Sequence, residues 1–251
     1  MTIDGAGRAR TELHFHLLPG VDDGPQSMEE SLELARLALA DGTRTITVTP
    51  HARFVDVRTV PERVAELRAA LRDAGIDLDV RTGVEVAQED DLDADELEIA
   101  AQGPPGRRWI LLEAPLVLDA PGLLEAASEV TTRGYGLLIG HPERCAELME
   151  PGGGLDTLEA LGAVLQVNGS SLTGRHGERA RAAALELALT GRAAVVASDA
   201  HRPSRGPVLS AAVAELVAAG LAPADAERLV SSSPAALLER GLAPSPAAPR
   251  G

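Results

Sequence analysis

The sequence predicts an α/β fold built on a parallel sheet, either closed into a barrel or doubly wound. Strand-like segments alternate with helix-like segments along the chain, which is typical of repeated βα units. The 251 residues suit one barrel-sized domain, and no linker interrupts the alternation. We therefore expect one domain at 11–241, between a flexible N-terminus at 1–10 and a disordered Pro/Ala-rich tail at 242–251.

The first half of the chain contains three predicted strands, at residues 11–15, 43–49 and 77–84. A Gly/Pro/Asp-rich loop at 18–26 follows the first strand. A capping box at Ser27 to Glu30 begins a helix that ends near Gly42, and Pro61 begins a second helix that ends at Gly75. The acidic stretch at 88–98 is expected to be a solvated loop or helix.

The second half repeats the alternation with four more predicted strands, at 108–112, 135–139, 163–167 and 193–197. Predicted helices lie at 121–133, 155–161, 178–190, 209–219, 224–231 and 235–240. The chain thus has about seven strands, each followed by a helix or a loop.

The composition excludes several classes of protein. The formal net charge is −15, which argues against a nucleic-acid or anionic-membrane partner, because Lys and Arg supply affinity for phosphate polymers. A single cysteine, Cys145, excludes an internal disulfide. We find neither an apolar run approaching the roughly 18 residues of a membrane span nor a signal-peptide core. We expect a cytoplasmic protein without stable membrane insertion. The sequence gives no indication of how many copies of the chain assemble.

Histidines and carboxylates gather at the predicted strand ends. Because the carboxyl ends of parallel strands open on one face, side chains far apart in the sequence are expected to meet there. The candidates are His14, His16, His51, Glu85, Glu113, His141, Asp199 and His201. His176 does not share this placement and is expected to be structural.

Imidazole combined with carboxylate suits zinc, manganese or iron better than magnesium or calcium. Eight ligands exceed the needs of one ion, so two or three divalent ions bridged by carboxylates are expected. Cobalt is also compatible with this ligand set. Asp22 and Asp23 precede a glycine, and we expect them to be turn residues or to support the ligands.

Several of these residues lie in motifs that resemble a known family. The run from His14 to Gly24, HFHLLPGVDDG, resembles the opening motif of the polymerase-and-histidinol-phosphatase (PHP) superfamily. It is most similar to the bacterial manganese-dependent protein-tyrosine phosphatases of capsule and exopolysaccharide loci. Further matches, in chain order, are Glu29-Glu30-Ser31-Leu32, Thr49-Pro50-His51, Gly83-Val84-Glu85, His141-Pro142-Glu143-Arg144 and Ser198-Asp199-Ala200-His201.

The resemblance implies a distorted (β/α)7 TIM-like barrel of the PHP type with a trinuclear metal centre, for which manganese is the expected metal. It also implies a phosphotyrosine protein as the substrate, such as a bacterial tyrosine kinase of polysaccharide synthesis. It implies that the eight candidates are metal ligands and that Arg144 and Arg205 bind phosphate. Ala52 departs from relatives that carry a second histidine there, and Arg202 in the basic segment before Arg205 competes for the phosphate role.

The expected reaction is attack of a metal-activated hydroxide on phosphorus, with the arginines holding the phosphoryl oxygens. Asp199 or a nearby histidine is expected to assist departure of the phenolate. Cys145 lacks the amide-rich loop of a cysteine phosphatase and is not expected to be a nucleophile. Two alternatives are a small-molecule phosphatase of the histidinol-phosphatase type and a non-catalytic metal-binding module.

Overall fold

The computed structural model describes residues 9–116 and 120–243. Eight strands lie in this part of the chain: β1 (Arg10–Phe15), β2 (Thr43–Val48), β3 (Asp79–Thr82), β4 (Glu85–Val86), β5 (Trp109–Glu113), β6 (Gly136–Gly140), β7 (Val164–Asn168) and β8 (Ala193–Ala197). All neighbouring strands pair in parallel, in one sheet of order β1-β2-β3 and a second of order β4-β5-β6-β7-β8. The α/β class and the parallel arrangement are therefore confirmed.

The predicted strand at 77–84 is shorter than expected, and a separate short strand follows it. β3 ends at Thr82, and β4 begins after Gly83 and Val84. A Cβ atom on Gly83 would lie 2.8 Å from Cγ2 of Thr47, so only glycine fits this close approach. Isolated parallel bridges connect the two sheets at Phe15 with Ala200 and at His51 with Glu85.

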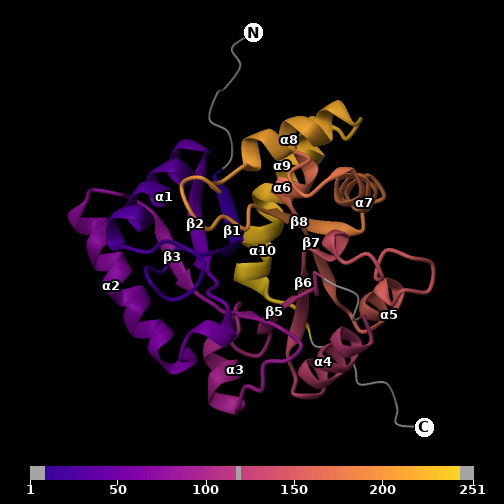
Figure 1. Ribbon diagram of the computed structural model, residues 1–251, viewed down its shortest axis with the longest axis horizontal. Coiled ribbons are helices and arrows are strands. Elements are labelled where there is room, and N and C mark those ends of the chain that lie inside the picture. Colours follow the sequence, from indigo (N-terminus) through magenta and orange to yellow (C-terminus); the bar gives the residue numbers. More distant parts are fainter. Residues whose placement is uncertain (1–8, 117–119, 244–251) are drawn as a thin grey trace.

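The helices lie mainly outside the strands (Figure 1). They are α1 (Met28–Ala40), α2 (Val60–Asp73), α3 (Ala94–Ala100), α4 (Ala120–Thr132), α5 (Leu155–Ala160), α6 (Gly169–Leu172), α7 (Glu178–Leu189), α8 (Leu209–Ala218), α9 (Pro223–Val230) and α10 (Ser232–Arg240). Short 3-10 helices occur at η1 (Ala52–Phe54), η2 (Val57–Thr59) and η3 (Pro142–Arg144). None of the helices described combines the length and apolar character that crossing a membrane requires.

The N-terminal caps explain where two helices begin. Ser27 caps α1 by accepting from the backbone N–H of Glu30, as the sequence predicts. The Glu30 carboxylate accepts from the N–H of Gln26 instead of closing the predicted box on Ser27. A complete capping box between Asp93 and Glu96 begins α3, which resolves the open expectation for residues 88–98.

The two ends of the strands have different surroundings. α10 packs at the amino ends, where Leu238 joins an apolar cluster with Leu13, Trp109 and Val195, and where Nε1 of Trp109 donates to the carbonyl of Leu237. At the carboxyl ends, Glu113 pairs in register with Gly140, next to His141. The amino ends of the strands are thus covered by apolar side chains, and the polar side chains lie at the carboxyl ends, where active sites of parallel barrels are built.

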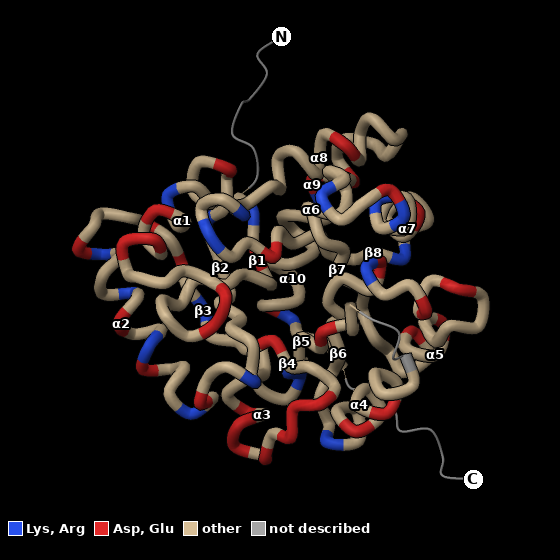
Figure 2. Tube along the Cα trace, viewed as in Figure 1, with Lys and Arg blue, Asp and Glu red and all other residues tan. Residues whose placement is uncertain are grey.

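The expected domain limits fall close to the ends of the described residues. β1 already begins at Arg10, and the N–H of Leu242 donates to the carbonyl of Arg107 at 3.0 Å. The expectations for residues 1–8 and 244–251 lie outside the described residues. Acidic residues predominate in α3 and in the loop before it, as the red segments of Figure 2 show.

Candidate metal centre

All eight predicted ligands meet at the carboxyl ends of the strands. The structure groups them by side-chain atoms that lie within 4.8 Å of one another and could hold a metal ion. The four groups are His16, Asp23, His51 and His201; His14, His16 and Asp199; His14, Glu85 and His141; and His51, Glu85 and Glu113. Four residues, His14, His16, His51 and Glu85, belong to two groups each, so the four groups overlap in space.

Glu85 lies at the middle of the cluster. Its Oε1 lies 3.1 Å from Nε2 of His14 and 3.4 Å from Nε2 of His141. Its Oε2 lies 2.9 Å from Nδ1 of His51 and 3.2 Å from Nε2 of His16. The interruption of the strand at Gly83 and Val84 places this carboxylate among imidazoles that come from three other strand ends.

Asp199 is the second carboxylate that faces several imidazoles. Its Oδ1 lies 3.3 Å from Nε2 of His14 and 3.5 Å from Nε2 of His16, and 3.4 Å from Nδ1 of His201. Its Oδ2 accepts a 2.8 Å hydrogen bond from the side-chain amide of Asn168. One oxygen of Asp199 is thus held by the protein, and the other points to the histidines.

Three of the histidines have their Nδ1 atoms anchored. Nδ1–H of His14 donates to Oε1 of Gln166 at 2.9 Å, and Nδ1–H of His16 donates to Oδ2 of Asp22 at 2.7 Å. Nδ1–H of His201 donates to the carbonyl of Asp199 at 2.8 Å. An anchored Nδ1–H fixes the tautomer that leaves Nε2 as the metal-binding atom.

The neighbouring residues Asp22 and Asp23 have different roles. Asp22 is a supporting residue, as expected, because its carboxylate also accepts from the N–H groups of Gly24 and His51. Oδ1 of Asp23 instead lies 3.2 Å from Nε2 of His201 and 3.6 Å from Nε2 of His51. The structure therefore adds Asp23 as a ninth candidate ligand, whereas the sequence predicts a turn residue or a residue that supports the ligands.

Two of the candidate ligands have an unusual backbone conformation. His141 has φ 42° and Asp199 has φ 51°, and among the described residues no other non-glycine residue has a positive φ. This conformation costs roughly 1–3 kcal/mol per residue and is typically retained at functional sites. It turns each chain sharply at the strand end, so that both side chains face the cluster.

The charges of the cluster stabilise one another in the metal-free chain. Burial opposes protonation of His14, but Glu85 and Asp199 outweigh burial and raise its pKa to about 9. Burial likewise opposes ionisation of Asp199, but the surrounding histidines, His14 foremost, lower its pKa to about 2. At neutral pH, the proton on His14 thus occupies a position that a divalent cation would take.

The unsatisfied atoms of the cluster fit a metal. Both oxygens of Glu85, Nδ1 of His51 and Nδ1 of His141 are buried and make no hydrogen bond of good geometry, although Glu85 lies within ion-pair distance of the imidazoles. Buried polar atoms without partners are destabilising, and coordination of a cation would satisfy those that face the cluster. Imidazole nitrogens with carboxylate oxygens are the donor set that manganese, iron, cobalt or zinc accepts.

The predicted phosphate-binding arginines lie at different depths. Nη1 of Arg144, on η3, lies 3.6 Å from Oδ2 of Asp199, and this side chain is largely buried. Nη1 of Arg205 lies 3.4 Å from Oδ2 of Asp23 at the more open rim. Arg202, the competing arginine, donates through Nε to the carbonyl of Asp23. Arg144 therefore faces the cluster, and Arg205 approaches it through Asp23.

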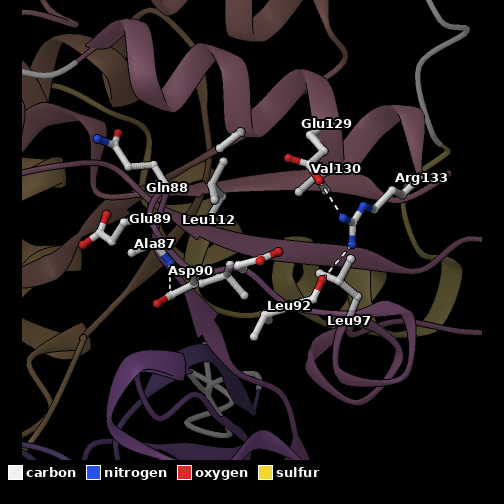
Figure 3. Close-up of a pocket in the computed structure, with 13 residues that line it drawn as sticks. Ala87, Gln88, Glu89, Asp90, Leu92, Leu97, Leu112, Glu129, Val130 and Arg133 are labelled. Carbon is white, nitrogen blue, oxygen red and sulfur yellow. Dashed lines mark hydrogen bonds and ion pairs between the residues drawn. The ribbon is translucent and has the colours of Figure 1, made fainter.

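The segment after β4, from Ala87 to Glu89, lines two pockets. One, of about 250 Å³, lies between this segment and α4 (Figure 3) and contains none of the candidate ligands. Arg133 at one end of it donates to the Glu129 carboxylate and to the carbonyl of Leu92. The other pocket, of about 430 Å³, is lined by Glu113 and Arg53 and adjoins the metal cluster.

A parallel α/β fold with buried imidazoles and carboxylates at the carboxyl ends of its strands defines a metallohydrolase type of protein. The chain belongs to the CpsB/CapC family of capsular polysaccharide synthesis, whose model matches residues 10–239. This membership confirms the resemblance to the capsule-locus phosphatases.

Curated relatives and a solved structure agree with this family. The chain is 31% identical over 194 residues to tyrosine-protein phosphatase YwqE of Bacillus subtilis, covering 76% of each chain. It is 30% identical over 205 residues to CapC of Staphylococcus aureus, covering 79% of each. A solved structure also matches the chain, and it comes from work on YwqE and on CpsB of Streptococcus pneumoniae, which are described as metal-dependent tyrosine phosphatases. It superposes with a TM-score of 0.80 at 28% identity, covering 94% of this chain and 98% of the other.

A more distant likeness concerns the fold alone. A variant of an organophosphorus hydrolase from Deinococcus radiodurans superposes with a TM-score of 0.56 at 16% identity, covering 94% of this chain and 95% of the other.

Proposed function

We propose that this protein is a metal-dependent protein-tyrosine phosphatase that hydrolyses phosphotyrosine on a bacterial tyrosine kinase of polysaccharide synthesis. One observation carries the proposal: histidines and carboxylates from six strand ends, including those that carry Glu85 and Asp199, meet in one cluster, in a chain of the CpsB/CapC family. The names of the relatives supply the phosphotyrosine substrate, and the family description supplies the connection with capsule synthesis.

In this proposal two or three divalent ions, with manganese as the expected metal, occupy the overlapping groups. The proposed ligands are the eight predicted residues together with Asp23. Glu85 would contribute to two of these groups, because each of its oxygens faces two imidazoles. When bound, such ions supply a hydroxide nucleophile at neutral pH and stabilise negative charge on the phosphoryl group.

The side chains of the protein have separate roles in the proposed reaction. Arg144 binds phosphoryl oxygens beside Asp199, since a guanidinium forms paired hydrogen bonds with phosphate, and Arg205 does so from the rim. Asp199, with its lowered pKa, is ionised at neutral pH. We therefore assign it to binding and orientation, and not to donating a proton to the leaving phenolate.

The remaining parts of the proposal concern architecture and location. We infer that β3 and β4 together act as one interrupted strand, so that the two sheets make up a distorted seven-stranded barrel. The bridges at Phe15 with Ala200 and at His51 with Glu85 support this inference. The single cysteine in the sequence, which excludes an intrachain disulfide, supports a cytoplasmic location.

The test is phosphate release from a phosphotyrosine peptide and from histidinol phosphate, measured side by side. Metal-stripped protein is assayed with and without added Mn²⁺. We expect Mn²⁺-dependent turnover of the peptide and little turnover of the metabolite. Preference for histidinol phosphate would instead assign the chain to metabolite chemistry, and turnover of neither compound would favour a non-catalytic metal-binding module.

A further inference from the structure

The two most exposed large apolar side chains of the described residues both adjoin the metal cluster. Phe54 is 58% exposed and Leu116 is 52% exposed, more than any other large apolar residue there. Phe54 follows the candidate ligand His51 by three residues, and Leu116 follows Glu113 by three. Exposed apolar area is unfavourable in water, so its concentration beside a reactive site indicates a contact surface.

The ring of Phe54 is held in place from two sides. It packs edge-on against the imidazole of His51, with ring centroids 5.8 Å apart and an interplanar angle of 83°. The Arg53 guanidinium lies 5.3 Å from the Phe54 ring centroid, and Nη1 of Arg53 is 3.0 Å from Oε2 of Glu113. Phe54 is thus positioned relative to two candidate ligands even though more than half of its surface is free.

The surface continues from Arg53 into the 430 Å³ pocket beside the cluster. Glu113 and Arg53 line this pocket together with Pro115 and Leu116, and the segment from Ala87 to Glu89 completes it. A group bound at the metal cluster that extends outward therefore meets Leu116 in this pocket, or Phe54 beside His51 and Arg53.

We propose that Phe54 is a specificity-determining residue that packs against the phenyl ring of the phosphotyrosyl substrate. The inference rests on the proposed function and deepens it. With the phosphoryl group on the ions and Arg144, the para-linked ring must pass the rim of the site, where Phe54 offers an aromatic surface. A phosphoserine side chain has no ring to make this contact, so Phe54 favours aryl over alkyl phosphates.

The experiment compares Phe54→Ala, Phe54→Tyr and a control, Leu189→Ala, in Mn²⁺-loaded protein. Leu189 is 44% exposed on α7, which carries none of the candidate ligands. Two ligands are titrated by calorimetry: a non-hydrolysable peptide with phosphonomethyl-phenylalanine in place of phosphotyrosine, and inorganic phosphate, which has no ring. The KM for the phosphotyrosine peptide is measured in parallel.

We expect Phe54→Ala to raise the Kd of the phosphonate peptide and the KM about tenfold, with the Kd of phosphate changed less than about twofold. Phe54→Tyr and Leu189→Ala should behave like the wild type. An unchanged Kd of the peptide for Phe54→Ala, or an equal rise in the Kd values of peptide and phosphate, would overturn the role of Phe54. In either case, turnover of phosphotyrosine by the wild type would still support the proposed function. A wild type that does not hydrolyse phosphotyrosine would overturn both.

Discussion

The side-chain amide of Asn168 donates a 2.8 Å hydrogen bond to Oδ2 of Asp199, and both residues are buried. The amide oxygen of Asn168 in turn accepts from the hydroxyl of Ser170 at 2.8 Å, and this hydroxyl lies 2.7 Å from Nε2 of His176. A chain of hydrogen bonds thus runs from His176 to Asp199. It supports Asp199 at the strained backbone position where β8 ends.

Replacing Asn168 by alanine should weaken metal binding and turnover without unfolding the chain. Loss of a hydrogen bond to a metal-binding carboxylate typically costs 10–100-fold in metal affinity or activity. Asn168→Asp should be at least as damaging, because it sets a second carboxylate against Asp199. Metal affinity and kcat are measured with circular dichroism as the control for folding. Wild-type affinity in both variants would show that this hydrogen bond does not support the site.

Arg144 should contribute to phosphate binding mainly through its paired donors. We expect Arg144→Ala to lower kcat/KM for a phosphotyrosine peptide by about 100-fold, and Arg144→Lys to recover only part of the loss, because an ammonium lacks the planar fork of a guanidinium. Arg228→Ala, at an exposed position on α9, is the matched control. Equal activity of the alanine and lysine variants would indicate that the geometry of the guanidinium does not matter.

Metal affinity should rise with pH. Since the pKa of His14 is raised to about 9 in the metal-free chain, this imidazole is protonated at neutral pH, and a cation must displace its proton. Between pH 7 and 9 the apparent affinity should increase by up to about tenfold per pH unit for each proton displaced. Calorimetry of Mn²⁺ binding in two buffers of different ionisation enthalpy measures the proton release. Identical heats in the two buffers would contradict this account.

Glu12 should make the metal-free chain less stable at high pH. Burial raises the pKa of Glu12 from 4.5 to about 8, and only its Oε2 has a partner, the N–H of Ser198. Because the pKa of this acid is higher in the folded state, its stabilisation is complete below about pH 4.5 and is lost as the pH rises through 8.

Glu12→Gln removes the loss of stability that ionisation of Glu12 causes, and its amide oxygen can still accept from the N–H of Ser198. In urea unfolding of metal-free protein, the variant should gain about 2–3 kcal/mol relative to the wild type between pH 6 and pH 9. A constant difference across that range would show that Glu12 does not ionise as inferred.

The sequence predicted most elements of the fold, because the signals for them are local. The α1 helix begins directly after its capping residue Ser27, and six of the eight predicted ligands lie within two residues of a strand end, while His51 and His201 lie three and four residues beyond one. The interruption of the third strand was not predicted. It depends on the close approach of Thr47 to Gly83, which is a contact between neighbouring strands and leaves no local pattern.

The site was predicted to the extent that its residues lie at strand ends. Asn168 also ends a strand, β7, so the same rule applied to amides would have found it. Asp23 could not be found in this way, because it lies in a loop that folds toward His51 and His201 from a distant part of the chain. Its Asp-Gly context is equally that of an ordinary turn.

The most direct test of the central claim measures metal content and phosphotyrosine hydrolysis on the same sample of wild-type protein. Both are determined as purified, after chelation, and after Mn²⁺ is restored, with Glu85→Gln protein treated in parallel. We predict that metal and activity disappear and return together in the wild type, and that Glu85→Gln retains less metal and little activity. Full phosphotyrosine hydrolysis by protein shown to be free of metal would contradict the account.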